Sequence, residues 1–183
     1  IRPHFLFNSI NAVLSLIRSD TKRAEIALED LSDLFRVLMA DNRQLSTLQQ
    51  EVDLCRRYLS LEQLRLGERL QVEWHIDNMP HDAQIPPLVL QPLLENAVYH
   101  GIEPHTESGV ININIFLRND QVHVVLRNPY QREGVHHTGN KMAMENIRER
   151  LSLHFDVEAS LTATLRDDSY QVHIIIPYLR AEK

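Results

Sequence analysis

The sequence of 183 residues has few of the features that define several protein classes. It contains one cysteine, Cys55, so it cannot form an internal disulfide, and we expect a reducing compartment and a buried thiol. No apolar run reaches the roughly 20 residues of a membrane-spanning helix. The net charge of −6 leaves no excess of basic residues, which argues against direct nucleic-acid binding.

Internal repeats and low-complexity tracts are also missing. The composition is otherwise that of an ordinary globular protein, with 43% hydrophobic and 24% charged residues. The chain begins without an initiator methionine or a charged leader, so we expect a fragment of a longer protein. Its length allows one large domain or two small ones.

Residues 1–43 are predicted to form an antiparallel helical hairpin, because apolar side chains recur at helical spacing in 3–19 and again in 20–41. In the first segment the predicted core stripe consists of Leu6, Ile10, Val13 and Ile17. In the second segment it includes Ile26, Leu31, Leu34 and Leu38. Since two helices alone cannot cover so wide an apolar face, we predict a homodimer that forms a four-helix bundle.

His4 lies on the polar side of the first predicted helix, roughly 160° from the centre of the stripe. Pro3 suits the first helical position, where its missing N–H costs nothing. The histidine is therefore expected to be exposed at the start of the helix. The bland alternative for His4 is an ordinary surface histidine near a helix N-terminus. Asn8 follows one turn later and is a candidate hydrogen-bond partner of the imidazole, although an ordinary polar surface position is equally compatible with Asn8.

Residues 44–183 are predicted to form a second domain of mixed composition. Thr47 and Gln50 make a capping-box pattern, and Gly67 stands where a helix-ending glycine belongs. Five segments of alternating polarity follow, at 70–77, 110–118, 121–127, 159–165 and 170–178. Helices are expected at 88–101 and 140–155. The fold class is therefore α+β, with the hairpin followed by a two-layer α/β sandwich of helices on one face of a mostly antiparallel sheet.

Two motifs carry a resemblance to a known family. PHFLFN at 3–8 and PLLENAVYHG at 92–101, in this order and spacing, resemble the LytS/AlgZ-type sensor histidine kinases. The similarity continues through RYLSLEQLRLGERL between them and ENIRERLSLHF near the end. It implies that residues 44–183 form the ATP-binding GHKL (Bergerat) sandwich of gyrase, heat-shock chaperone ATPases and MutL. It also implies the cytoplasmic transmitter of a bacterial inner-membrane sensor, attached to the membrane only through an N-terminal region outside this sequence.

The resemblance also implies roles for individual residues. His4 would accept a phosphoryl group from Mg-ATP and pass it to an aspartate of a response regulator, of the LytTR type in this family. Asn96 would hold Mg²⁺, while Glu95 and His100 would line the triphosphate site. A neutral imidazole is already a nucleophile and needs positioning more than a base. Pro92 occupies the place of a water-activating carboxylate, which favours a kinase over a dedicated ATPase.

The chain departs from the family pattern around the nucleotide. Asn128 stands where an adenine-binding aspartate is expected; its carbonyl still accepts a hydrogen bond but lacks the charge. Gly139 matches the first glycine of the phosphate loop, whereas Lys141 and Ala143 replace the next two. The Lys141 ammonium is itself able to reach a phosphate. The alternative function is therefore a signalling scaffold or phosphatase with a degenerate pocket, which acts on its regulator without autophosphorylation.

Other candidate sites carry less weight. The adjacent pair His136–His137 has no second pair at metal-ligand spacing, so a structural metal is not expected. Arg148 and Arg150 fall in a charged helical segment and are predicted to lie on its solvated face.

Overall fold

The computed structural model describes residues 2–41, 43–130 and 137–181, without the side chains of 137–139. Its sheet has five strands in the order β2-β4-β5-β7-β6. Their bounds are β2 Leu70–His75, β4 Gly109–Arg118, β5 Gln121–Pro129, β6 Ser160–Arg166 and β7 Ser169–Pro177. Strand β2 runs parallel to β4, and the other neighbours are antiparallel.

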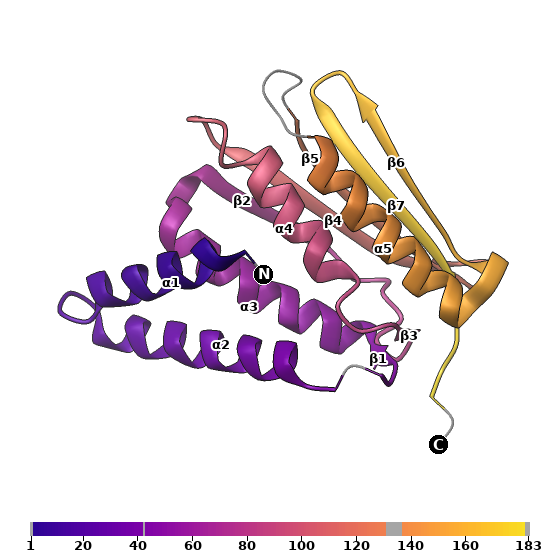
Figure 1. Ribbon diagram of the computed structural model, residues 1–183, viewed down its shortest axis with the longest axis horizontal. Helices are drawn as coiled ribbons and strands as arrows, with labels where there is room; N and C mark the ends of the chain where they lie inside the picture. Colours follow the sequence, from indigo (N-terminus) through magenta and orange to yellow (C-terminus); the bar gives the residue numbers. More distant parts are fainter. Residues whose placement is uncertain (1, 42, 131–136, 182–183) are drawn as a thin grey trace.

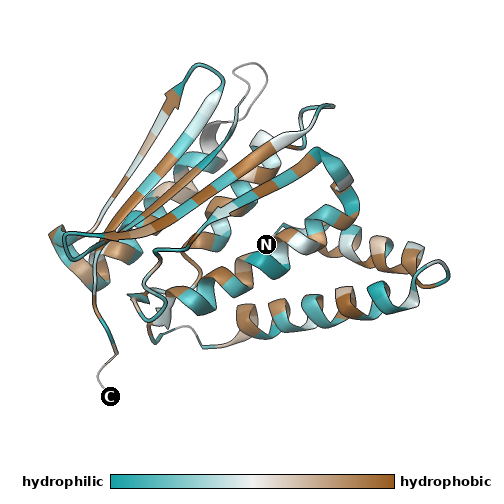
Figure 2. Cartoon of the chain, turned by 180° about the vertical axis from the view of Figure 1, so that it is seen from behind, coloured by the Kyte–Doolittle hydropathy of each residue, from teal (hydrophilic) through white to brown (hydrophobic). Residues whose placement is uncertain are grey.

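Helices α4 (Leu90–Gly101) and α5 (His137–Phe155) cover one face of this sheet (Figure 1). Seen from behind, the strands lie in front of both helices, and brown and teal residues alternate along them (Figure 2). In β4 the residues facing the helices, Ile111, Ile113 and Ile115, are buried. The predicted α+β sandwich is therefore confirmed, and on α4 the side chains of Leu90, Leu94, Ala97 and Val98 are buried.

The connections follow from local chemistry. Asn119 and Asp120 link β4 to β5 with φ of 53° and 58°, a left-handed conformation that asparagine and aspartate tolerate better than most residues.

A second, smaller sheet pairs two strands of two residues each, β1 (Ser46–Thr47) and β3 (Gln84–Ile85). It was not predicted, because strands this short show no alternation of polarity. Short 3₁₀ turns lie at Gly67–Arg69, just before β2, and at Asp156–Glu158, just after α5.

Three helices precede the sheet. Helices α1 (Pro3–Leu16) and α2 (Thr21–Met39) form the predicted hairpin. Helix α3 (Leu48–Leu66) packs on both of them and on α4, so it joins the hairpin to the sandwich (Figure 1). The predicted capping box of α3 is present, with both reciprocal hydrogen bonds between Thr47 and Gln50. None of the helices in the described residues is long and apolar enough for a membrane span.

The buried face of α1 differs from the predicted stripe. Phe5, Ser9 and Val13 are buried, whereas Ile10 and Ile17 are exposed. The reason is that α1 rests on α2 and α3 together, and this groove selects a face rotated away from the stripe. Similarly, Ile26 of α2 is exposed. The apolar residues left exposed are Phe7, Ile10 and Leu14 on α1 and Ile17 directly after it.

A buried clamp fixes the loop that leads into α4. The Glu51 carboxylate of α3 accepts a hydrogen bond from the backbone N–H of Leu88 at 3.0 Å. Arg150 of α5 donates to the carbonyls of Leu88, at 3.1 Å, and of Pro87. The prediction of a solvated Arg150 was therefore wrong. Burial raises the pKa of Glu51 to about 7.

Candidate functional site

Helix α4 separates two pockets. Glu95, Val98 and Tyr99 line the first one, together with the start of α1. Residues Leu93, Asn96, Ala97 and His100 line the second one, which lies towards the sheet and α5. On a helical wheel the two sets are centred roughly 150° apart. We call the first the histidine pocket and the second the sandwich pocket.

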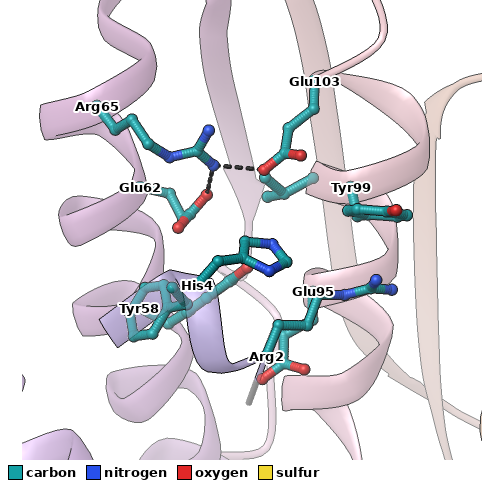
Figure 3. Close-up of a pocket in the computed structure, with 10 residues that line it drawn as sticks. Arg2, His4, Tyr58, Glu62, Arg65, Glu95, Tyr99 and Glu103 are labelled. Atoms are coloured by element: carbon teal, nitrogen blue, oxygen red, sulfur yellow. Dashed lines mark hydrogen bonds and ion pairs between the residues drawn. The ribbon is translucent and has the colours of Figure 1, made fainter. Parts of the chain in front are cut away.

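The histidine pocket holds His4, on the first turn of α1 (Figure 3). The side chain is exposed, as predicted, and its ring centroid lies 6.4 Å from that of Tyr99. The guanidinium carbon of Arg2 lies 3.6 Å from the centroid of the same tyrosine ring. Behind His4, Phe5 is buried against Tyr58, with 5.2 Å between the ring centroids. Aromatic contacts therefore attach the start of α1 to both α3 and α4.

Charged groups surround the other side of this pocket. Arg65 of α3 bridges Glu62 at 2.6 Å and Glu103, just beyond α4, at 2.5 Å (Figure 3). Glu62 is only 3% exposed, and desolvation raises its pKa, while the charges of Arg65 and His4 oppose this rise. The pocket thus combines three carboxylates, those of Glu62, Glu95 and Glu103, with two guanidinium groups.

The sandwich pocket contains a set of amide and aromatic side chains. It is lined by Asn96 and His100 of α4, Asn128 and Tyr130 at the end of β5, Asn140 and Met144 of α5, and Tyr170 of β7. The Asn96 amide donates a hydrogen bond to the Asn140 carbonyl oxygen at 3.1 Å. The Asn128 amide donates to the Pro129 carbonyl at 2.7 Å. These bonds hold the two predicted nucleotide-binding asparagines in place.

A close backbone approach brings α4 to the end of β5. A Cβ on Gly101 would lie 2.6 Å from the Asn128 amide nitrogen and 2.7 Å from the Pro129 carbonyl oxygen. Only glycine fits there without displacing β5. The glycine that closes PLLENAVYHG therefore sets the spacing between His100 and Asn128.

The structure brings some of the predicted site residues together and separates others. Asn96, His100 and Asn128 share the sandwich pocket, whereas Glu95 lies with His4 in the histidine pocket. Asn8 is half-buried on α1 and is not among the residues that line either pocket. Lys141 is exposed on α5, beside Asn140 in a hollow next to the sandwich pocket.

Two predictions fall on residues that the structure does not fully describe. Gly139 lies within α5, but its surroundings are outside the described part of the chain, as is His136. Within the described residues, no group of three or more histidine, cysteine, aspartate or glutamate side chains is arranged to hold a metal ion.

Several residues of both pockets were not predicted from the sequence. Tyr130 and Tyr170 face each other at 5.7 Å between ring centroids and fill one wall of the sandwich pocket. Asn140 lies in α5 with no motif to mark it. Glu62 and Arg65 lie within RYLSLEQLRLGERL, where the resemblance marked the stretch but gave no role to either residue.

The residue types of the sandwich pocket fit Mg²⁺ and a nucleotide, but its space is small. The Asn96–Asn140 bond uses an N–H of Asn96, so the Asn96 carbonyl oxygen, a hard ligand, is the group to face a cation. The free space inside the pocket is about 10 Å³, room for about one water molecule and far below the roughly 300–1,000 Å³ of pockets that hold a drug-sized ligand. A nucleotide therefore requires Asn140 or the tyrosine wall to shift.

Known proteins are similar to this chain over its whole length. Residues 1–70 match the family model described as Histidine kinase. The chain is 31% identical over 198 positions to the sensor protein LytS of Oceanobacillus iheyensis, an alignment that covers 100% of this chain and 34% of that protein. It is 27% identical over 201 positions to the sensor histidine kinase/phosphatase LytS of Staphylococcus aureus, with 100% and 34% coverage.

Solved structures show the same fold at low sequence identity. The histidine kinase AdeS of Acinetobacter baumannii has a TM-score of 0.52 at 13% identity, over 90% of this chain and 83% of that chain. The histidine kinase domain of the blue-light activated kinase EL346 of Erythrobacter litoralis has a TM-score of 0.53 at 17% identity, over 91% and 86%. The sandwich is therefore of the GHKL type. Together with the two motifs, these matches show that the chain belongs to the LytS-type sensor histidine kinases, of whose length it spans about a third.

Proposed function

We propose that the chain is the transmitter of a two-component sensor, which uses Mg-ATP to phosphorylate His4 and passes the phosphoryl group to an aspartate of a response regulator. The observation that carries the proposal is an exposed histidine at the start of a helical hairpin joined to a GHKL-type sandwich. A nucleophile that meets first a nucleotide and then a partner protein has to be accessible, and His4 is.

The residues of the sandwich pocket have distinct tasks in this reaction. The Asn96 carbonyl oxygen would hold Mg²⁺, which neutralises phosphate charge when bound. His100 and the exposed Lys141 supply donors for phosphate oxygens, and the Asn128 carbonyl accepts from the adenine amino group. In the transfer, one imidazole nitrogen of His4 forms the N–P bond while the P–O bond to ADP breaks. The other ring nitrogen keeps its proton.

The partner and the assembly are parts of the same proposal. A histidine kinase, ThkA, solved in complex with its response regulator TrrA has a TM-score of 0.52 to this chain, at 17% identity and over 96% of this chain and 59% of that chain. This supports a response regulator as the partner; the LytTR type rests on the resemblance. The exposed apolar residues of α1 support a homodimer through the hairpin. A bacterial inner-membrane location would depend on a region outside this sequence.

A second candidate is a regulator-binding scaffold or phosphatase that does not autophosphorylate. The small sandwich pocket, walled by Tyr130 and Tyr170 and bridged by the Asn96–Asn140 hydrogen bond, favours it. One of the relatives is itself named a kinase/phosphatase.

Incubation of the chain with radiolabelled ATP and Mg²⁺ separates these functions. The kinase is expected to take up acid-labile, base-stable label that disappears in the His4→Gln variant. Absence of label together with absence of nucleotide binding would instead support the scaffold and contradict the kinase. Steady release of phosphate that is unchanged in His4→Gln would indicate an ATPase and contradict both proposals.

A further inference from the structure

Helix α4 begins without the local features that usually fix the start of a helix. Val89, at its N-cap position, makes no side-chain hydrogen bond to the first turn, and no acidic residue lies in that turn. Leu88, just before it, has a φ of 59°, a left-handed conformation that is costly for a residue with a side chain. Such a backbone persists only where surrounding groups hold it, so the start of α4 depends on contacts from other elements.

Three hydrogen bonds from neighbouring helices hold this start. The Leu88 N–H donates to Glu51 of α3, while Arg150 of α5 donates to the carbonyls of Leu88 and Pro87. The two donors of Arg150 are its terminal nitrogens, Nη1 for Leu88 and Nη2 for Pro87. A guanidinium group carries its donors in a rigid plane, so one side chain can fix two adjacent carbonyls. Arg150 therefore makes two of the three bonds.

A second contact joins the same two helices further along. Near the beginning of α5, the Asn140 carbonyl oxygen accepts a hydrogen bond from the Asn96 amide at 3.1 Å. Asn140 and Arg150 lie roughly 15 Å apart along α5. The end of α5 thus holds the beginning of α4, and the beginning of α5 holds Asn96, as expected for antiparallel helices side by side over the sheet (Figure 1).

The position of α4 affects both pockets. The helix supplies Glu95 to the histidine pocket, and Asn96 and His100 to the sandwich pocket. A helix this short moves as a rigid rod, so a shift at its start displaces the Asn96 side chain by a similar distance. Loss of a group that orients a metal ligand typically weakens metal binding by about 10- to 100-fold. A change in the clamp is therefore expected to reach the proposed ligand of Mg²⁺.

We propose that Arg150 is a positioning residue of the nucleotide site, which sets the place of α4, and with it of Asn96, through the carbonyls of Pro87 and Leu88. The inference rests on the proposed function, because it takes the sandwich pocket as the site of Mg-ATP. Arg150 is not among the residues that line this pocket. It acts through α4 and not by contact with the nucleotide.

Calorimetric titration with a non-hydrolysable ATP analogue and Mg²⁺ tests the effect on the site. Each variant is titrated at a temperature at which circular dichroism shows it to be folded. Arg150→Met, which keeps the aliphatic part of the side chain but has no donor, is expected to weaken binding about tenfold. Arg150→Lys keeps a donor for one of the two carbonyls and should recover part of the affinity.

Arg148→Met is the matched control for this titration. It removes the same charge from the same helix, and Arg148 is half-buried like Arg150. Its guanidinium donates to the Leu161 carbonyl of β6 and to Glu145, and not to the loop before α4. The affinity of Arg148→Met should therefore stay close to that of the parent chain.

Amide hydrogen exchange tests the position of α4 without any nucleotide. In Arg150→Met the amides of residues 88–101 are expected to exchange several-fold faster, while those of β5 and β7, inside the sheet, keep the parent rate. In Arg148→Met the amides of α4 should also keep the parent rate. Equally faster exchange in every segment of Arg150→Met would show a general loss of stability and would contradict a specific role in placing α4.

Two further results would overturn the proposal while leaving the kinase function in place. Parent affinity in Arg150→Met would mean that the site does not need the clamp. An equal loss in Arg148→Met would mean that the lost charge, and not the place of α4, explains the effect. Absence of nucleotide binding in the parent chain would instead refute the proposed function, and the exchange of α4 would still decide whether Arg150 positions this helix.

Discussion

Glu95 and Asn96 are neighbours in the chain but face different pockets on opposite sides of α4. The carboxylate lies with His4, and the amide lies with His100 and Asn128. This follows from the 100° step between consecutive residues of a helix, which places residues four apart on one side and adjacent residues on different sides. One short motif therefore supplies a residue to each of the two sites.

Replacement of Asn96 by alanine is expected to weaken the binding of Mg-ATP about tenfold or more. The variant loses the proposed oxygen ligand and leaves the Asn140 carbonyl without its donor. Calorimetric titration with a non-hydrolysable ATP analogue and Mg²⁺ measures the effect. Asn146→Ala, on the exposed surface of α5, is the matched control. Equal affinities for both variants would remove Asn96 from the proposed site.

Gly101→Ala is expected to lower the free energy of unfolding by about 1–3 kcal/mol and to weaken nucleotide binding as well. The new methyl group would meet an amide and a backbone carbonyl at the end of β5. Gly109→Ala provides the comparison, because its nearest neighbour at 2.7 Å is the flexible end of the Ile102 side chain. Urea unfolding of both variants measures the difference. A larger loss in Gly109→Ala would contradict the assignment of Gly101 as the tighter contact.

The raised pKa of Glu51 predicts a pH-dependent stability. Its carboxyl group titrates near 4.5 when unfolded and at about 7 when folded, so the folded state binds more protons between these values. The stabilisation is complete below pH 4.5 and is lost as the pH rises through 7. Glu51→Gln stays neutral and should therefore be more stable than the parent chain at pH 8, by about 3 kcal/mol, and similar at pH 4.5. Thermal unfolding at both pH values checks this, and an equal difference at both would exclude the assigned titration.

Leu14→Glu is expected to convert the proposed dimer into a monomer. Leu14 is 59% exposed on the apolar face of α1, where a buried charge in a four-helix bundle would be costly. Leu153→Glu is the matched control, because Leu153 is 84% exposed on α5, far from the hairpin face. Light scattering coupled to size-exclusion chromatography gives the mass of each variant. A parent chain that stays monomeric at high concentration would disprove the dimer.

The sequence by itself determined the elements and their order. Alternation of polarity located all five strands of the sheet, and the Thr47–Gln50 capping box was placed correctly. These features are local, because they depend on residues a few positions apart. The exposure of His4 also followed from its position on the wheel of a single helix.

The tertiary structure decided which partner each face meets. Two faces of α1 are apolar, and only its packing on α2 and α3 shows that Phe5, Ser9 and Val13 are the buried ones. The same holds for the Arg150 clamp on Pro87 and Leu88 and for which pocket each side of α4 lines. The spacing of apolar residues predicts that a helix has an apolar and a polar side. Which side chains are buried and which charges pair depends on residues far away in the chain.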